Sequence, residues 1–197
     1  MNVDATSSGN GKLYFYFTKS GFMNTSLVPP GCTAWSLTKP VDILNDPPEY
    51  LMKTFPVYVG DDLYEGRTFE RHSLFTFITS IDDFEMLINR FSVAELFHYK
   101  NELTSGNIIH DLVKNPNPEC YFKLCESLTD EELSLLANDK NKFGEKPIEY
   151  VTAVDIFKDL AQFTKFVPTT LLSCIQNNNG IANYVIDVLY ANNIIDR

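Results

Sequence analysis

Long apolar runs are absent from this sequence of 197 residues. The apolar stretch at residues 13–17 (LYFYF) is far shorter than the roughly 18 residues that a membrane-spanning helix requires. The first residues are polar and acidic, whereas a secretory signal begins with basic residues and continues into an apolar segment. The sequence therefore predicts neither a membrane span nor a secretory leader.

Basic residues are also scarce. Sixteen Lys and Arg stand against 26 Asp and Glu, which gives a formal net charge of −10. Nucleic acids and anionic membranes are bound through Lys and Arg, so both are disfavoured as partners. We expect instead that the partner is another protein with a basic surface, because complementary charge favours encounter.

Cysteine and histidine are too few and too widely spaced for a zinc site, so we predict no bound metal and no cofactor. Two of the four cysteines, Cys120 and Cys125, lie five positions apart in a predicted helix and would point in different directions. Cys32 and Cys174 complete the set. Buried free thiols in a reducing compartment are the better interpretation, and this favours a cytoplasmic protein.

No catalytic signature stands out, and no residue is predicted to be catalytic. The alternative hypothesis is a small cysteine-dependent effector enzyme with Cys32 as its nucleophile. Cys32 follows Pro-Pro-Gly in a predicted loop, and His72, His98 or His110 could act as the base. A buried or incidental cysteine is the competing interpretation.

Proline divides the chain into two parts. Six of the ten prolines fall within residues 1–66, where they disfavour long helices. The apolar stretches in this part are short and rich in aromatic or β-branched residues: 13–17, 34–37 and 55–59. We predict two or three short strands with irregular loops, forming a small capping segment over residues 1–66.

From about Thr68 onward the apolar residues recur every three or four positions, which is the helical spacing. We therefore predict short paired helices over residues 67–197 and a mostly α fold. The positions that carry this spacing are Leu74, Phe77, Ile78, Ile81, Phe84, Leu87, Ile88, Phe91, Ile109, Leu112, Val113, Tyr121, Leu124, Cys125, Leu128, Ile156, Leu160, Phe163, Val185, Val188 and Leu189.

Two glycines, Gly106 and Gly144, each open a predicted helix after a polar turn, and they are 38 residues apart. The second segment, with Gly144, Pro147 and Ile148, resembles the Gly, Pro and Leu places of the ankyrin repeat, a unit of about 33 residues made of a turn and two helices. Lys146 stands at the Thr place of that motif. We expect a turn at Gly144 and a helix that begins at Pro147.

The resemblance covers about residues 67–195, as three or four divergent repeats in a helix-pair solenoid. A generic α-solenoid is the alternative. The second helices of the repeats are predicted at residues 81–88, 118–125 and 181–190, with first helices at 71–80 and 170–176. The unit from residue 144 to residue 168 is expected to lack a second helix of normal length. Ankyrin arrays bind other proteins and carry no chemistry of their own, so the resemblance implies a non-enzymatic interaction module.

The turns at residues 97–105 and 137–143 are the predicted contact surface. They mix aromatic with polar residues, as interface hot spots do. The predicted partner-binding residues are Phe97, Tyr99, Lys100, Asn138, Lys140, Lys142 and Phe143. The alternative for Phe143 is a buried contact between repeats. The abundance of Asn, Ile, Phe and Lys suits a viral or bacterial protein that binds a host protein in the host cytoplasm or nucleus.

Three short segments give local predictions. The resemblance implies that His110 bonds to the backbone of the neighbouring turn. Thr129 and Glu132 have the spacing of a helix capping box. Asp82 and Asp83 are expected just before a helix.

Overall fold

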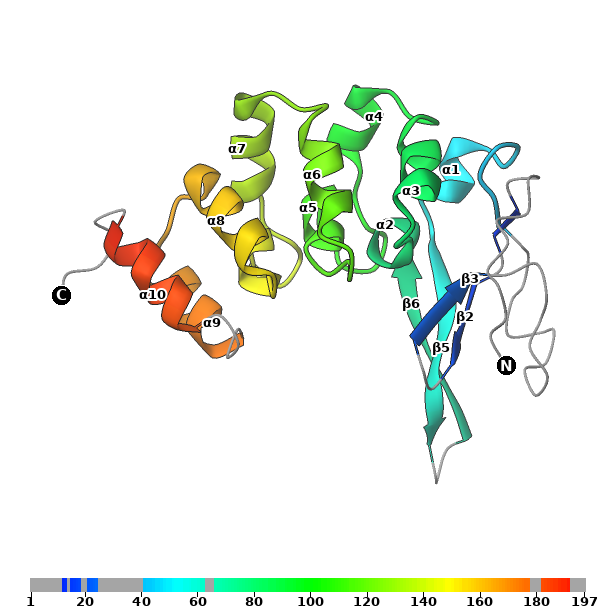
Figure 1. Ribbon diagram of the computed structural model, residues 1–197, viewed down its shortest axis with the longest axis horizontal. Coiled ribbons are helices and arrows are strands. Elements are labelled where there is room, and N and C mark those ends of the chain that lie inside the picture. Colours follow the sequence, from blue (N-terminus) through cyan, green and yellow to red (C-terminus); the bar gives the residue numbers. More distant parts are fainter. Residues whose placement is uncertain are drawn as a thin grey trace. The chain divides into compact units, whose positions relative to one another are not determined.

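The computed structural model describes residues 12–13, 15–18, 21–24, 41–62, 66–177 and 182–191 (Figure 1). The protein is mostly α-helical, as the apolar spacing predicts. It divides into two compact units, Met1–Phe77 and Ile78–Arg197. The division falls after Phe77 and not after residue 66, because strand β6 (Gly66–Ser73) pairs with strand β5 (Thr54–Asp62) inside the first unit.

The described residues of the N-terminal unit form three antiparallel strand pairs: β1 with β4, β2 with β3, and β5 with β6. The longest is the β5–β6 hairpin, whose register runs from Thr54 opposite Ser73 to Asp62 opposite Gly66, with an irregularity between Tyr58 and Gly60. The remaining elements are β1 (Lys12–Leu13), β2 (Phe15–Thr18), β3 (Gly21–Asn24), β4 (Val41–Asp42), α1 (Pro48–Leu51) and α2 (Leu74–Phe77).

The predicted strands at residues 13–17 and 55–59 are largely present in β1, β2 and β5. The third predicted stretch, at residues 34–37, lies outside the described residues, as does Cys32. Of the helix predicted over residues 71–80, only the four residues of α2 are helical. Residues 66–73 form β6, and α2 ends after four residues.

The helix that follows α2 begins separately. Helix α3 (Ile81–Ile88) starts at Ser80, whose side chain accepts a hydrogen bond from the backbone N–H of Asp83 at 3.3 Å. Because Ser80 satisfies this otherwise unpaired N–H, the chain can break at residues 78–80 and start a new helix. Asp82 and Asp83 therefore lie in the first turn of α3 and not before it, where a negative charge favours the positive end of the helix dipole.

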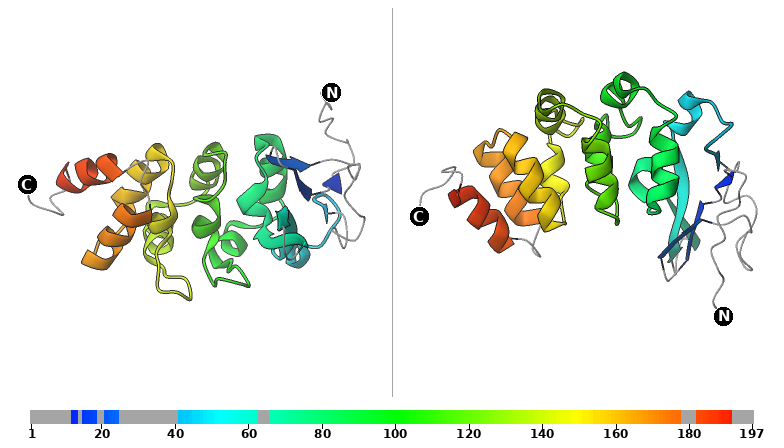
Figure 2. Two further views of the ribbon diagram at one scale, coloured as in Figure 1. Left: turned by 90° about the horizontal axis from the view of Figure 1, so that it is seen from below. Right: turned by 45° about the horizontal axis from the view of Figure 1, so that its top comes forward.

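The helical unit continues from α3 to α10, and its helices follow one another in chain order along a row (Figures 1 and 2). None of the described helices is long and apolar enough to cross a membrane. After α3 come α4 (Val93–His98), α5 (Ile108–Leu112), α6 (Glu119–Cys125), α7 (Asp130–Asn138), the 3-10 helix η2 (Pro147–Tyr150), α8 (Val154–Phe163), α9 (Pro168–Asn177) and α10 (Ala182–Ala191).

Most residues with helical apolar spacing form the core of this unit. The buried ones are Ile78, Phe84, Leu87, Ile88, Phe91, Ile109, Leu112, Val113, Tyr121, Leu124, Ile156, Leu160 and Val185. Contacts run in two series, one through α5, η2 and α9 and the other through α7, α8 and α10. Several of these contacts join helices that are not consecutive in the chain, such as α5 with η2 and η2 with α9, so the short helices share one core.

Two further predictions can be compared with these helices. Thr129 and Glu132 form both hydrogen bonds of a capping box at the start of α7, which confirms that prediction. The unit that begins at Gly144 does contain a second helix of normal length, since α8 has ten residues. The expectation of a short one was wrong because Ala153, the residue before α8, forms no side-chain cap that would mark the start in the sequence.

Candidate functional site

The loop between α4 and α5 contains a tight turn at residues 101–106. The side-chain oxygen of Asn101 accepts hydrogen bonds from the N–H groups of Leu103 and Thr104, at 3.0 and 3.2 Å. The backbone N–H of Asn101 donates to the carbonyl of Gly106 at 2.8 Å. Because asparagine satisfies the amides of its own turn, the chain reverses with few unpaired backbone groups.

The loop between α7 and η2 contains a turn of the same construction at residues 141–145. The side-chain oxygen of Asn141 accepts from the N–H groups of Phe143 and Glu145, at 2.9 and 3.1 Å. Its own N–H donates to the carbonyl of Glu145 at 3.0 Å. Gly144 has φ of 84°, and Pro147 is the first residue of η2, so both predictions for this segment are confirmed.

The equivalent of Gly144 in the first turn is Ser105, which also has a positive φ, 55°. The positive-φ residues are therefore 39 positions apart, and Gly144 corresponds to Ser105 and not to Gly106. The asparagines Asn101 and Asn141 are 40 apart, because the first turn is one residue longer. Gly106 has another role. A Cβ atom on Gly106 would lie 2.9 Å from the Cβ of His110, so a glycine permits the close approach of α5 to this turn.

The two turns are bonded to each other. The backbone N–H of Lys142 donates to the carbonyl of Thr104 at 2.8 Å. The Nδ1 atom of His110 accepts from the N–H of Asn107 at 3.1 Å, which leaves Nε2 to carry the proton and donate to the carbonyl of Glu145 at 3.0 Å. The predicted bond from His110 to the backbone of the neighbouring turn is confirmed.

His110 is buried, and this burial lowers its pKa below the ordinary value. The carbonyl of Glu145 and the carboxylate of Asp139 act in the opposite direction, but burial is the larger cause. The neutral ring is therefore the form that joins the turns.

Asn107 attaches the first turn to α7. Its side-chain oxygen caps α5 by accepting from the N–H groups of Ile109 and His110, at 3.0 and 3.3 Å. Its side-chain nitrogen donates to the carbonyl of Leu136 at 2.8 Å and to the carboxylate of Asp139 at 3.2 Å. The two turns and the end of α7 thus form one hydrogen-bonded group.

Each turn exposes a large apolar side chain two residues after its asparagine. Leu103 is 39% exposed and Phe143 is 65% exposed, so Phe143 is not a buried contact between helices. The Lys142 ammonium lies 5.1 Å from the centre of the Phe143 ring, and Lys140 and Glu102 are exposed beside them. We name this set, Glu102, Leu103, Lys140, Lys142 and Phe143, the turn surface.

Two residues predicted to bind a partner form hydrogen bonds within the protein. Tyr99 is only 3% exposed, and its hydroxyl donates to Asp111 at 2.7 Å. The side-chain nitrogen of Asn138 donates to the carbonyls of Ser134 and Phe163, at 2.8 and 2.7 Å. Neither side chain belongs to the turn surface, and Tyr99 is too deeply buried to contact a partner.

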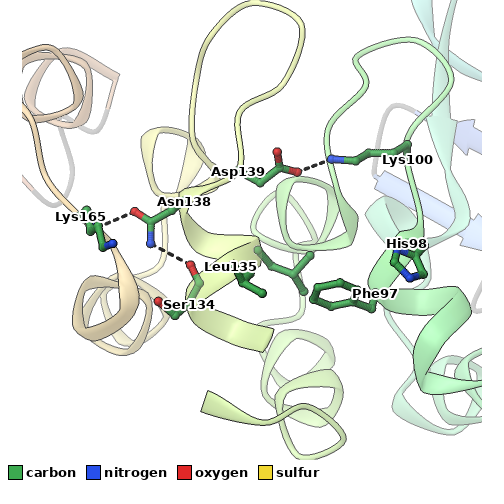
Figure 3. Close-up of a pocket in the computed structure, with 9 residues that line it drawn as sticks. Phe97, His98, Lys100, Ser134, Leu135, Asn138, Asp139 and Lys165 are labelled. Carbon is green, nitrogen blue, oxygen red and sulfur yellow. Dashed lines mark hydrogen bonds and ion pairs between the residues drawn. The ribbon is translucent and has the colours of Figure 1, made fainter. Parts of the chain in front are cut away.

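Two other predicted residues, Phe97 and Lys100, line a separate open groove with a volume of about 490 Å³ (Figure 3). Lys100 forms an ion pair with Asp139 at the groove (Figure 3). The lining residues are Phe97, His98, Lys100, Ser134, Leu135, Leu136, Asn138, Asp139 and Lys165.

Sequence reasoning did not single out Leu103 or Leu135. Leu135 lies off the apolar side of α7 formed by Leu133 and Leu136 and is 63% exposed, so the helical spacing could have identified it. No comparable signal exists for Leu103, because the exposure of a turn residue depends on how the turn packs.

The described residues offer little metal or thiol chemistry. They contain no cluster of His, Cys, Asp and Glu that could hold a metal ion. Cys120, Cys125 and Cys174 are free thiols. Burial raises the pKa of Cys120 to about 11 and the pKa values of Cys125 and Cys174 to about 12, so these three stay protonated at neutral pH.

No protein-family model, no curated protein and no solved structure matches this chain.

Proposed function

We propose that this protein is a non-enzymatic protein-interaction module that binds its partner through the turn surface. The observation that carries the proposal is the exposure of Leu103 and Phe143 on two turns that are bonded to each other. Large apolar side chains on a rigid support lose little conformational entropy on binding, and such residues tend to be interface hot spots.

The proposal includes an ankyrin-like array of three or four divergent repeats. Its support is the recurrence of one unit, in which an asparagine turn is followed by a short helix, α5 or η2, and then by longer helices. The two series of helix contacts, α5–η2–α9 and α7–α8–α10, also suit stacked helix pairs that share one core.

The partner of this proposal has basic character. The chain carries a net charge of −10, and complementary charge increases the rate of encounter and disfavours wrong partners. Lys140 and Lys142 are local exceptions on the turn surface. They would pair with acidic groups at the edge of an otherwise basic partner surface.

The experiment compares affinity with stability in one substitution. The partner is captured from lysate with the full chain and purified, and its Kd is then measured for wild type and for Phe143→Ala. We expect Phe143→Ala to weaken binding by about 1 kcal/mol or more, because it removes an exposed anchor. The thermal midpoint should hardly change, since the ring is 65% exposed.

Leu172→Ala is the matched control, because Leu172 is a similarly exposed apolar residue on α9, at 59%. It should leave the affinity unchanged. Equal affinities for wild type, Phe143→Ala and Leu103→Ala, with the fold intact, would show that the partner uses another face.

The cysteine-dependent effector remains an alternative, and no observation favours it. It rests on Cys32, which lies outside the described residues.

A further inference from the structure

The groove lined by α4 and α7 has an apolar floor that the turn surface does not include. Phe97 from α4 and Leu135 from α7 form this floor (Figure 3), together with Leu136 from α7. Leu135 is 63% exposed, although its neighbours Leu133 and Leu136 are buried. An apolar side chain of a ligand could therefore bury area here without any rearrangement of the helices.

Three of the six polar residues that line the groove are Lys or His. Lys100, Lys165 and His98 line the groove, and Asp139 is the only carboxylate among the lining residues. That carboxylate is already occupied, since it forms an ion pair with Lys100 and accepts a hydrogen bond from Asn107. The lining of the groove thus carries a positive charge, whereas the chain as a whole has a net charge of −10.

Three lysines, Lys140, Lys146 and Lys165, lie at or next to the groove, and we name them the lysine group. Lys165 lines the groove, and Lys146 bonds to the lining residue Asn138. Lys140 directly follows the lining residue Asp139 in the chain. The Lys146 ammonium donates to the side-chain oxygen of Asn138 at 3.1 Å and to the backbone carbonyl of Lys165. Within the described part of the chain, none of the three lysines forms an ion pair with a carboxylate.

The lysine group is electrostatically unfavourable as it stands. Lys146 is only 5% exposed, and its two hydrogen-bond acceptors are neutral oxygens. Its burial lowers its pKa, and the positive charges of Lys140 and Lys165 lower it further, against the opposing charge of Glu149. An anion placed beside Lys140 and Lys165 would reduce this repulsion.

We propose that the groove binds an acidic peptide segment of another protein, with an apolar side chain on Phe97 and Leu135 and its carboxylates at the lysine group. The inference rests on the proposed protein-binding function, but it assigns a second contact, which shares only Lys140 with the turn surface. A free inorganic anion would use the lysines alone and would leave the apolar floor empty.

Three labelled peptides added to the full chain test the proposal by fluorescence anisotropy. The probe is Glu-Glu-Leu-Phe-Glu-Glu. The comparison peptides are Gln-Gln-Leu-Phe-Gln-Gln, which lacks the charge, and Glu-Glu-Ser-Ser-Glu-Glu, which lacks the apolar pair. We expect saturable binding of the probe, and binding of each comparison peptide that is weaker by about fivefold or more.

Two substitutions test the location. Lys165→Glu and Leu135→Ser should each weaken probe binding by about fivefold or more, because one reverses a charge at the lysine group and the other removes part of the floor. Lys158→Glu and Leu172→Ser are the matched controls, since both residues are exposed and neither lines the groove. These two variants should bind the probe as wild type does.

The proposal is overturned if the probe shows no saturable binding, if all three peptides bind equally, or if Leu135→Ser binds like wild type. Competition by inorganic phosphate, together with equal binding of both acidic peptides, would mean that only an anion is recognised, and this result also overturns it. Phe143→Ala should not affect probe binding. The probe could fail to bind while Phe143→Ala still lowers the affinity for the purified partner. In that case the turn-surface proposal stands and the groove proposal does not.

Discussion

At the scale of single residues, the two turns differ at the position that has a positive φ. Gly144 adopts φ of 84° and Ser105 adopts 55°, although residues with a Cβ atom rarely occupy this region. No atom lies within 4 Å of a Cβ built on Gly144, so the cost of a substitution there is conformational and not steric. The two positions therefore offer a paired test of backbone strain.

Gly144→Ala should lower the free energy of unfolding by about 1 to 2 kcal/mol, because it forces a Cβ atom into the left-handed region. Ser105→Gly should change the free energy of unfolding by no more than about 0.5 kcal/mol, because the relief of backbone strain offsets the greater entropy of the unfolded chain. Urea denaturation of both variants measures this difference. Equal effects would contradict the equivalence of the two turns.

His110 gives the stability a pH dependence. Its pKa in the folded protein is below the ordinary histidine pKa of 6.5, so between these two pKa values the unfolded chain binds more protons than the folded one. The contribution of His110 is therefore fully present above about pH 6.5 and is lost as the pH falls toward the folded pKa.

Unfolding measured between about pH 5 and pH 8 should show stability that decreases toward acid, and His110→Gln should reduce this slope. His98→Gln is the control, because His98 is exposed. An unchanged slope in His110→Gln would show that other groups cause the acid sensitivity.

At the scale of helices and turns, the caps decide where the short helices begin. Asn107 and Ser92 are both N-caps with capping boxes, at α5 and α4 respectively. They differ in burial, since Asn107 is fully buried and also donates to the carbonyl of Leu136, whereas Ser92 is exposed.

Asn107→Ala should therefore lower the free energy of unfolding by about 2 to 3 kcal/mol, because it removes the cap and leaves a buried carbonyl without its donor. Ser92→Ala should cost less, since water can replace its hydrogen bond. Chemical denaturation of the two variants measures the contrast. Equal losses would mean that the link from Asn107 to α7 contributes nothing to stability.

At the scale of the whole molecule, the net charge of −10 predicts how binding responds to salt. Association with the basic partner proposed above should slow as the ionic strength rises from about 0.05 M to about 0.5 M, because salt screens long-range attraction. Dissociation should change less, since close contacts are screened less. Stopped-flow or surface-based kinetics with the purified partner measure both rates. Association that speeds up with salt would contradict a basic partner.

The sequence by itself determined the features that depend on neighbouring residues. Apolar spacing predicts the mostly helical fold, and the Thr129–Glu132 pair predicts the start of α7 because both of its hydrogen bonds form within four residues. Gly144 and Pro147 predict a turn followed by a helix start for the same reason, since a positive φ and a fixed φ are local properties.

Only the tertiary structure decided which side chains face the solvent. Tyr99 has the appearance of an interface residue in the sequence, but it is buried, and its hydroxyl donates a hydrogen bond to Asp111, twelve positions away. The equivalence of Ser105 with Gly144 depends on the pairing of two turns through Thr104 and Lys142. The groove likewise forms only where α4 and α7 lie close together. The spacing of residues along the sequence does not show this, because tertiary packing sets the distance between the two helices.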